Sequence, residues 1–554
     1  MLISLVAWIY ISIICLIWGQ MTLAVLVKTK QSPKFSFSAG LICLAGLSSI
    51  SVLALGLSLF MPLDWKAQFI ILLPATGYLL KRDNRQAFKT QAGQWLTSFS
   101  PTGYCLLASC ILLILTISVY KIEHPDTLTY HAKSILLFKR YTPVPGIANL
   151  KVQLGFQSSW FAAMALFQWD SPLFYNVTFL NGAVLCWFFI GIVQKISRRF
   201  RWPWFLLLSY TLLSWTQIRL TAASASPDFI VTLYVWAAIY AYLEFENKQE
   251  DNRRILCLVW IFCTAAFLIK LSAIAILLLG IVIMVRFFRL RQTWSMVLFS
   301  AIGIGILLTR NFIASGYPFY PVSLPNIGPA DWRMKAATLH TLQQYITTYA
   351  RFPVSYAEAA TQYHASLQSW IPLWWEEIGF PDRLLLLGIA AGILIHLATL
   401  LKRKKYPLVL WLAAIGSLLW FLQAPHPRFG TGFLIPLVYF LYRTLPLPFL
   451  QKEIKIPFLS RHTLYVLATG CLLMAIGGYT VFRCVRFLTP SELIRPTGIM
   501  ASAYDPDGCE NIQVDIKNNK IVTRNNQGPI VCFGEIGSFT PRGSTIGEGF
   551  KPAE

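Results

Sequence analysis

The segment Glu123–Lys133 concentrates acid–base groups in a chain that is otherwise poor in charge. It holds two acids, two histidines, a tyrosine and a lysine, although only 13% of the whole chain is charged. Asp126 follows an apolar run closely, and Tyr130 and His131 lie about one helical turn further on. A carboxylate in this position can serve as a general base. Alternatively, Pro125-Asp126 simply begins a helix, because acids are favoured in the first turn.

The neighbouring side chains leave more than one role open. His131 can orient Asp126, contact a substrate or face another loop, and Lys133 can reach toward an anionic lipid head group. Asp126, His124 and His131 together offer metal-ligating atoms, but their spacing matches no standard zinc site. The chain also has no Cys-x-x-Cys or Cys/His metal spacing. We therefore expect no cofactor, and a divalent metal is not favoured.

Two further ionisable residues stand at the ends of apolar runs. Lys270 interrupts the apolar stretch Ile255–Val285, and a lysine at membrane depth is costly enough to mark a site by default. The alternative is a solvated turn between two helices. Asp228 follows Ser226-Pro227, which is a typical helix start and explains the acid without any further function.

Two arginines could hold a phosphate. Arg428 lies in the segment His426–Gly430 and Arg310 begins a Gly- and Pro-rich segment. A guanidinium group can bind a phosphate through two parallel hydrogen bonds. The alternative for both residues is contact with ordinary lipid head groups.

These residues are embedded in a strongly apolar chain. The 554 residues are 56% hydrophobic, and the mean hydropathy is +0.57. Runs rich in Leu, Ile and Ala favour membrane helices rather than a β-barrel, whose strands would alternate. We predict about fourteen transmembrane helices. They cover residues 3–27, 38–61, 66–81, 103–119, 172–194, 204–219, 228–245, 255–270, 271–287, 294–309, 383–401, 407–423, 429–446 and 463–482.

The net charge of +23 follows the membrane pattern rather than that of a nucleic-acid-binding protein. Lys and Arg gather in five short clusters that this span count places on one side, which the positive-inside rule makes cytoplasmic. The first run has no basic leader and is expected to be a retained helix. Both termini and the segments 120–171, 310–382 and 483–554 then lie outside. The clusters are 28–34, 81–89, 195–201, 286–291 and 402–405.

The outer segments are expected to carry short helices at the membrane interface. Ala132–Tyr141 interleaves apolar and basic residues, as an interfacial helix does. Gln157–Gln168 is expected to form a second interfacial helix or a half-buried re-entrant one. Asp331 can cap a helix that runs to about Phe352. Three tryptophans, Trp370, Trp374 and Trp375, are typical of an interfacial aromatic belt.

The polar C-terminal segment is expected to be a small cap. Ile512–Val514 and Ile530–Phe533 have the composition of short strands. Cys509 and Cys532 are placed for a disulfide if the compartment is oxidising, and the sequence leaves that question open. The expected organisation is N-terminal helices at 1–101, a catalytic module at 102–446, a last helix at 447–486 and the cap at 487–554.

The motifs together resemble those of the GT-C superfamily of polytopic membrane glycosyltransferases, over about residues 100–445. Tyr317 stands where the family usually has a polar residue. A single acid stands where metal-dependent members have an Asp-x-Asp pair. The matching motifs are Asp126 with Tyr130-His131, Ser226-Pro227-Asp228, Ile269-Lys270-Leu271-Ser272, Arg310-Asn311 with Gly316–Pro321, and His426-Pro427-Arg428-Phe429.

The resemblance implies an enzyme of the bacterial plasma (inner) membrane that builds cell-envelope polysaccharide. Its donor would be a sugar on a polyprenyl phosphate, and its acceptor a glycan or lipid-linked hydroxyl at the outer leaflet. Asp126 would be the base, and Tyr130, His131, Lys133, Asp228, Lys270, Arg310, Asn311 and Arg428 would bind substrate. The alternatives are a polysaccharide polymerase or ligase of another fold, and a lipid-linked glycan flippase or transporter without chemistry.

Overall fold

The computed structural model describes residues 1–27, 37–120, 122, 124–171, 174–176, 179–198, 202–247, 253–356, 358–399, 406–444, 461–494, 513–517, 520–524, 539–543 and 546–553. Several predictions lie outside these residues. They concern the basic clusters 28–34 and 402–405, the pair Cys509 and Cys532, and the strand Ile530–Phe533.

The chain is a mainly α-helical polytopic membrane protein. Within the described residues, eight helices are long and apolar enough to cross a membrane. They are α1 (Leu2–Val27), α2 (Ala39–Leu57), α5 (Pro101–Ser118), α9 (Phe179–Arg198), α12 (Asp228–Asn247), α15 (Arg291–Ser315), α19 (Phe380–Thr399) and α23 (Arg461–Phe487).

The other predicted spans also fall on helices, but shorter or broken ones. The predicted span 204–219 divides at Ser214, and the predicted span 271–287 begins with a 3-10 turn, Leu271–Ile276. The helices concerned are α3 (Trp65–Leu80), α10 (Trp202–Leu213), α11 (Trp215–Ala222), α13 (Arg253–Ile269), α14 (Leu277–Phe287), α20 (Leu408–Gln423) and α21 (Pro427–Arg443). The amphipathic α4 (Arg82–Leu96) follows α3 and was not predicted as a helix.

The core is built on close helix contacts. Every residue of α13 from Ile255 to Ile269 is buried, so α13 faces other helices on all sides. Helices α1 and α2 approach each other at glycines, because a Cβ on Gly19 would lie 2.1 Å from the carbonyl oxygen of Ile42. Small residues allow such close backbone approach in membrane helices.

The segment 120–171, which was predicted to lie outside and which we call the first outer segment, folds inward in its described residues rather than lying wholly on the surface. Helix α6 (Ala132–Arg140) matches the predicted interfacial helix, with Ile135 and Phe138 buried. Helix α8 (Ser159–Phe167) lies within the predicted Gln157–Gln168, and all of its residues are buried. This helix is more fully buried than either predicted alternative, interfacial or half-buried re-entrant, because all of its residues except Ser159 are apolar.

The segment 310–382, which was predicted to lie outside and which we call the second outer segment, carries α16 (Ala336–Tyr349), α17 (Ala359–Gln362) and α18 (Leu367–Glu377). The prediction that Asp331 caps α16 was wrong, because Lys335 is the residue before its first turn. Asp331 instead pairs with Arg542 at 3.2 Å and Lys551 at 3.0 Å. These two cations from the C-terminal segment hold the carboxylate away from the helix start.

The described part of the C-terminal segment contains two short hairpins. Strand β3 (Gln513–Lys517) overlaps the predicted strand Ile512–Val514 and pairs with β4 (Lys520–Arg524). Strands β5 (Phe539–Pro541) and β6 (Phe550–Pro552) pair beside the first outer segment. Phe550 is fully buried there, and its N–H donates to the carbonyl of Pro145 at 2.9 Å. A third hairpin, β1 (Trp169–Ser171) with β2 (Phe174–Asn176), lies in the first outer segment.

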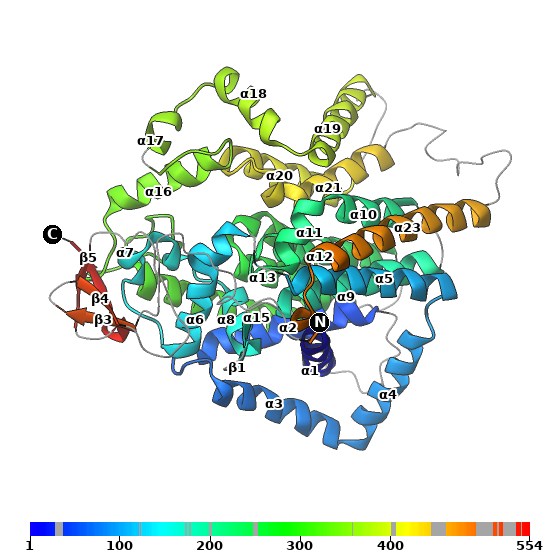
Figure 1. Cartoon of the computed structure of the whole chain (residues 1–554), viewed down its shortest axis with the longest axis horizontal. Coiled ribbons are helices and arrows are strands. Elements are labelled where there is room, and N and C mark those ends of the chain that lie inside the picture. Colours follow the sequence, from blue (N-terminus) through cyan, green and yellow to red (C-terminus); the bar gives the residue numbers. More distant parts are fainter. Residues whose placement is uncertain are drawn as a thin grey trace.

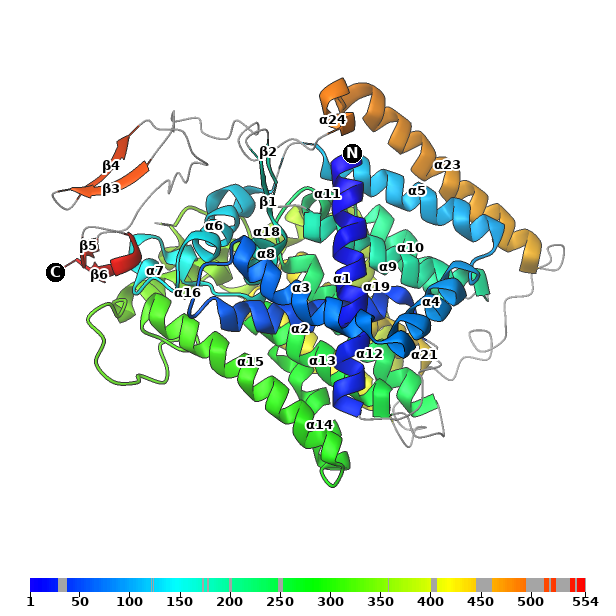
Figure 2. The ribbon, with the colours of Figure 1, turned by 90° about the horizontal axis from the view of Figure 1, so that it is seen from below.

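The short elements gather away from α4 and the tip between α14 and α15. In Figure 1, α7 (Ile147–Leu150), α16 and the C-terminal strands lie at the left, and α4 lies at the lower right. In Figure 2 the C-terminal strands and α6 lie toward the left, α24 (Pro490–Ile494) lies at the top beside the N-terminus, and the tip between α14 and α15 lies at the bottom.

Candidate functional site

A π-helical turn follows Asp126 directly. It spans Thr127–His131, and the N–H of Ala132 donates to the carbonyl of Thr127. Such wide turns are rare in proteins, and those that occur often lie at functional sites. The Thr127 hydroxyl accepts the N–H of Ala225 at 3.2 Å and lies 3.2 Å from Nδ1 of His131. The turn is thereby fixed to the segment that leads into α12.

The start of α12 positions Asp228 as the sequence predicts. The Ser226 hydroxyl accepts the N–H of Asp228 at 3.3 Å. The amide of Asn181, in α9, donates to the carbonyl of Ser226 at 3.1 Å and of Thr221 at 3.0 Å. Local capping and the buried amide of Asn181 therefore place the Asp228 carboxylate at the N-terminal end of α12.

The start of α21 positions Arg428. His426 precedes the helix, and its Nδ1 accepts the N–H of Arg428 at 3.3 Å. Trp420 donates its indole N–H to the carbonyl of His426 at 2.8 Å, and Trp374 donates to the carbonyl of Pro425 at 2.8 Å. Two tryptophans from different helices therefore fix the backbone before Arg428.

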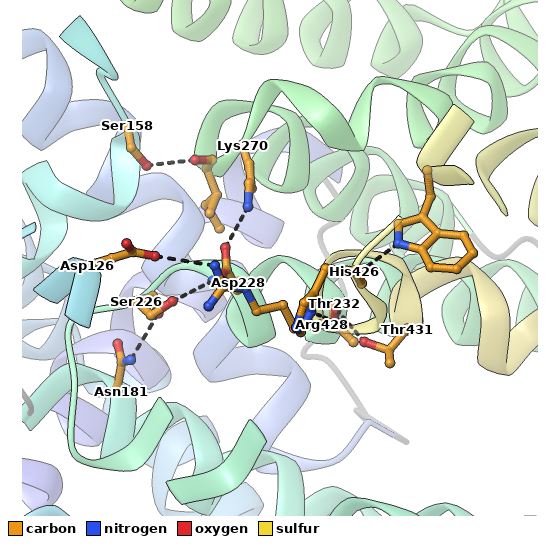
Figure 3. A network of polar contacts seen from close by, with 12 residues as sticks. Asp126, Ser158, Asn181, Ser226, Asp228, Thr232, Lys270, His426, Arg428 and Thr431 are labelled. Carbon is orange, nitrogen blue, oxygen red and sulfur yellow. Dashed lines mark hydrogen bonds and ion pairs between the residues drawn. The ribbon is translucent and has the colours of Figure 1, made fainter. Parts of the chain in front are cut away.

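Asp126, Asp228, Lys270 and Arg428 meet in one place, which we call the inner cluster (Figure 3). Nζ of Lys270 lies 2.6 Å from Oδ1 of Asp228. Nε of Arg428 lies 3.7 Å from Oδ2 of Asp228, and its terminal nitrogen lies 3.4 Å from Oδ2 of Asp126. Four segments far apart in the sequence therefore bring together two acids and two cations.

The four side chains of the inner cluster differ in exposure. Asp228 is the most enclosed, with 13% of its side chain exposed, whereas Asp126 is 34% exposed. Both cations also contact the ring of Phe429, with Nζ of Lys270 4.0 Å from its centroid. Nε of Arg428 is buried and has no hydrogen-bond acceptor within reach. An unsatisfied buried donor is rare in proteins and can indicate a missing ligand.

Two buried histidines border the inner cluster. Burial lowers the pKa of His124 and, more strongly, that of His131. Asp126 and Asp228 act in the opposite direction on His124, and Arg428 and Lys270 add to the lowering. Both imidazoles are therefore neutral at physiological pH. Their rings lie 5.6 Å apart, and Nδ1 of His124 is buried without a hydrogen-bond partner.

Tyr130 connects the turn to the C-terminal hairpin. Its ring contacts His131 edge-on at 4.3 Å and packs on an apolar cluster that includes Val144, Ile147 and Phe550. Burial, followed by the charge of Asp126, raises the pKa of Tyr130 well above its usual value. A neutral phenol at this position can donate a hydrogen bond but is a poor base at physiological pH.

A cavity opens beside Arg428, with a volume of about 110 Å3. It lies between residues 349–353, the end of α18 and the start of α21. Trp374, predicted as part of an aromatic belt, is only 7% exposed and lines this cavity. Trp370 is likewise buried, so these two rings pack inside the protein instead of facing lipid.

Two of the residues predicted to bind substrate have contacts outside the inner cluster. Arg310 is buried in α15, where it donates to the carbonyl and hydroxyl of Ser58 and to the amide oxygen of Gln157. Its guanidinium stacks over Phe138 at 3.9 Å. Asn311 donates to the carbonyl of Pro318 at 2.8 Å and so fixes the turn after α15. Both sets of contacts fit a structural role.

The remaining predicted residue, Lys133, is half-buried on α6. The sequence analysis did not single out Thr127, which bonds to the distant residue Ala225, or Arg351, which lines the cavity beside Arg428. Among the described residues, no group of three or more His, Cys, Asp or Glu side chains is arranged to hold a metal ion.

Comparison with known proteins identifies a family but no characterised relative. Neither a curated protein nor a solved structure matches the chain. Residues 1–435 match a family described as "Domain of unknown function (DUF8201)". This match covers most of the chain and includes all four residues of the inner cluster. The chain therefore belongs to the DUF8201 family.

Proposed function

We propose that the protein is a membrane glycosyltransferase of the GT-C type. It moves a sugar from a polyprenyl phosphate to an acceptor hydroxyl at the outer leaflet of a bacterial plasma membrane. The observation that carries the proposal is the inner cluster, in which Asp126 lies 3.4 Å from Arg428 and Arg428 shares Asp228 with Lys270. About fourteen crossings and outward-facing termini are part of the same proposal.

The two cations are suited to holding the phosphate of a lipid donor. Lys270 and Arg428 stand at helix ends, and both are more than two-thirds buried. A phosphate oxygen could accept the unsatisfied Nε–H of Arg428. The leaving phosphate gains negative charge as its bond to the sugar breaks. Preorganised cations in a partly dry site stabilise that charge most effectively.

Asp126 is suited to being the base. Its carboxylate takes the proton of the acceptor hydroxyl while the oxygen forms a bond to the anomeric carbon. The bond from that carbon to the phosphate oxygen breaks, and its electron pair leaves with the polyprenyl phosphate. Asp126 ends the step protonated and returns the proton to water. Asp228, with the shorter contact to Lys270, keeps the cations in place.

The contact between Asp126 and Arg428 has a further role in this proposal. At 3.4 Å it is longer than an ordinary charge-assisted hydrogen bond, and Asp126 is the most exposed member of the cluster. A sugar ring must lie between the base and the phosphate for attack from the opposite face. A bound donor phosphate therefore replaces Asp126 on Arg428 and releases the carboxylate for the acceptor.

The proposal is tested with purified protein and polyprenyl phosphates that carry hexoses or pentoses. Asp126→Asn is expected to bind the donor as the wild type does and to lose about a hundredfold or more of the transfer rate. Asp331→Asn is the matched control, because that carboxylate also pairs with two cations but lies at the surface. Its transfer rate should stay close to that of the wild type.

The alternatives give different results in the same experiment. A flippase or transporter in which Asp126 is only structural would show no transfer and would keep its flux in Asp126→Asn. A polymerase or ligase that relies on arginines would transfer sugar equally well with and without the Asp126 carboxylate. Either result would exclude the proposed mechanism.

A further inference from the structure

The cavity beside Arg428 has the composition of a carbohydrate site. Its walls include the aromatic rings of Tyr349, Phe352, Trp374 and Phe429 and the charged groups of Arg351 and Glu377. Among the ion pairs of the described residues, none joins Arg351 to Glu377. The cavity therefore presents a hydrogen-bond donor, Arg351, and an acceptor, Glu377, that are not paired with each other.

The Trp374 wall of this cavity is closely packed. Trp374 meets Trp370 edge-on at 6.0 Å and lies tilted against Trp420 at 6.4 Å between ring centroids. Arg351 is held over the ring of Trp370 at 4.9 Å and donates to the carbonyl of Tyr363 at 2.9 Å. Side chains that are fixed before a ligand arrives lose less entropy when it binds.

A row of three tyrosines extends from the cavity, and Arg428 in the cavity wall lies 3.4 Å from Asp126. Tyr349 lines the cavity, and its ring lies 5.5 Å from that of Tyr345, which lies 5.1 Å from that of Tyr356. Tyr349 is 41% exposed and Tyr356 is 38% exposed, so both rings are open to a ligand. The charge of Asp126 is close enough to raise the pKa of Tyr345, after burial and Tyr349.

The chemistry of these walls selects among ligand classes. A sugar ring has an apolar face of C–H groups, which packs on aromatic rings, and an edge of hydroxyls, which needs both donors and acceptors. A purely apolar lipid chain would cover the Glu377 carboxylate without giving it a polar partner, and a simple anion would use Arg351 and Arg428 but neither Glu377 nor the aromatic rings. A saccharide uses all of the walls at once.

We propose that this cavity and the row of Tyr345, Tyr349 and Tyr356 bind a saccharide of the acceptor. The cavity holds one sugar unit against Trp374, and the tyrosines carry the chain toward Asp126. The identification of this saccharide as the acceptor rests on the proposed function. Saccharide binding itself needs neither the donor nor sugar transfer.

The test is saturation-transfer NMR on the full chain in nanodiscs, without donor. The probes are maltotetraose, cellotetraose, chitotetraose and tetragalacturonate. At least one is expected to bind, and Tyr349→Ala should weaken that binding about tenfold, whereas Tyr349→Phe should stay within about twofold. The control Trp411→Ala removes an exposed aromatic ring elsewhere, on α20, and should bind as the wild type does.

Binding that is equally strong in Tyr349→Ala, or no binding by any of the four tetrasaccharides, would overturn the inference. Tyr349 is exposed, so its replacement is expected to leave the fold intact. Glu377→Gln gives a second measurement, because loss of the acceptor charge should weaken binding severalfold without changing the aromatic walls. Saccharide binding is measured without donor, whereas sugar transfer is measured separately with the donor present. A failure of the proposed transfer is thereby separated from a failure of saccharide binding.

Discussion

Two clusters in this protein have the same composition at their centre and differ in their surroundings. In the inner cluster, Asp228 contacts Lys270 and Arg428 at 2.6 and 3.7 Å. In an outer cluster, Asp331 contacts Lys551 and Arg542 at 3.0 and 3.2 Å. The exposed fraction of the central carboxylate side chain is 13% in the first and 43% in the second.

This difference indicates that the burial of such a cluster, more than the identity of its contacts, determines its contribution to stability and ligand binding. Water screens the outer pairs, so they contribute little to stability and mainly hold the C-terminal hairpin beside Trp332. The inner pairs have lost much of their water, so each charge depends on its partners. An anionic ligand that enters the inner cluster can therefore replace a carboxylate as the partner of Lys270 or Arg428. The net cost is low, because each cation keeps a negatively charged partner with and without the ligand.

The largest expected effect comes from breaking the inner cluster. Asp228→Asn leaves Lys270 and Arg428 short of one negative charge and should destabilise the protein by about 3–5 kcal/mol. Thermal unfolding of the purified protein in one detergent measures this loss. Adding Lys270→Met to Asp228→Asn should recover part of it. A loss no larger than that of Asp331→Asn would mean that burial does not separate the two clusters.

The second-largest effect is expected when the pH is lowered, because two buried histidines border the inner cluster. Burial lowers the pKa of His124 and His131, so the unfolded chain binds protons that the native protein does not. Stability is complete above about pH 6.5 and falls as the pH drops below it, by up to about 1.4 kcal/mol per pH unit for each histidine. Thermal unfolding at pH 7.5 and 5.5 checks this slope. His124→Asn should reduce the slope, and an unchanged slope would assign it to other groups.

The smallest effect is expected for the outer cluster. Asp331→Asn should cost at most about 1 kcal/mol, because both ion pairs are exposed and screened. The cost should shrink further at 1 M salt, where charges interact over only about 3 Å. Thermal unfolding of the two proteins at low and high salt measures the difference. A large loss that does not depend on salt would show that Asp331 holds the outer segments together in another way.

The sequence predicted local features well and long-range ones poorly. Ser226-Pro227-Asp228 was expected to begin a helix, and it does, because capping depends on adjacent residues. Asp331 was expected to cap a helix as well, but its partner Arg542 lies 211 residues away and could not be inferred from local pattern. Lys270 was singled out because a lysine in an apolar stretch is conspicuous.

Residues of the same type with the same predicted role have different surroundings in the structure. Arg428 and Arg310 both follow a pattern that predicts a phosphate ligand. Arg428 contacts two carboxylates in the inner cluster, whereas Arg310 donates to Ser58 and Gln157 and stacks over Phe138. Likewise, the spacing of Trp370 and Trp374 suits a membrane belt, but contacts with the later helix α20 bury them. Only the packing of distant helices distinguishes these cases.

The affinity of polyprenyl phosphate for the purified protein tests the central claim most directly. Arg428→Gln removes the guanidinium of the inner cluster, and Arg542→Gln removes that of the outer one. Loss of one charge-assisted contact to a phosphate should raise the Kd of Arg428→Gln about tenfold or more. Arg542→Gln should bind as the wild type does. Equal affinity in all three proteins would contradict the assignment of the inner cluster as a lipid-phosphate site.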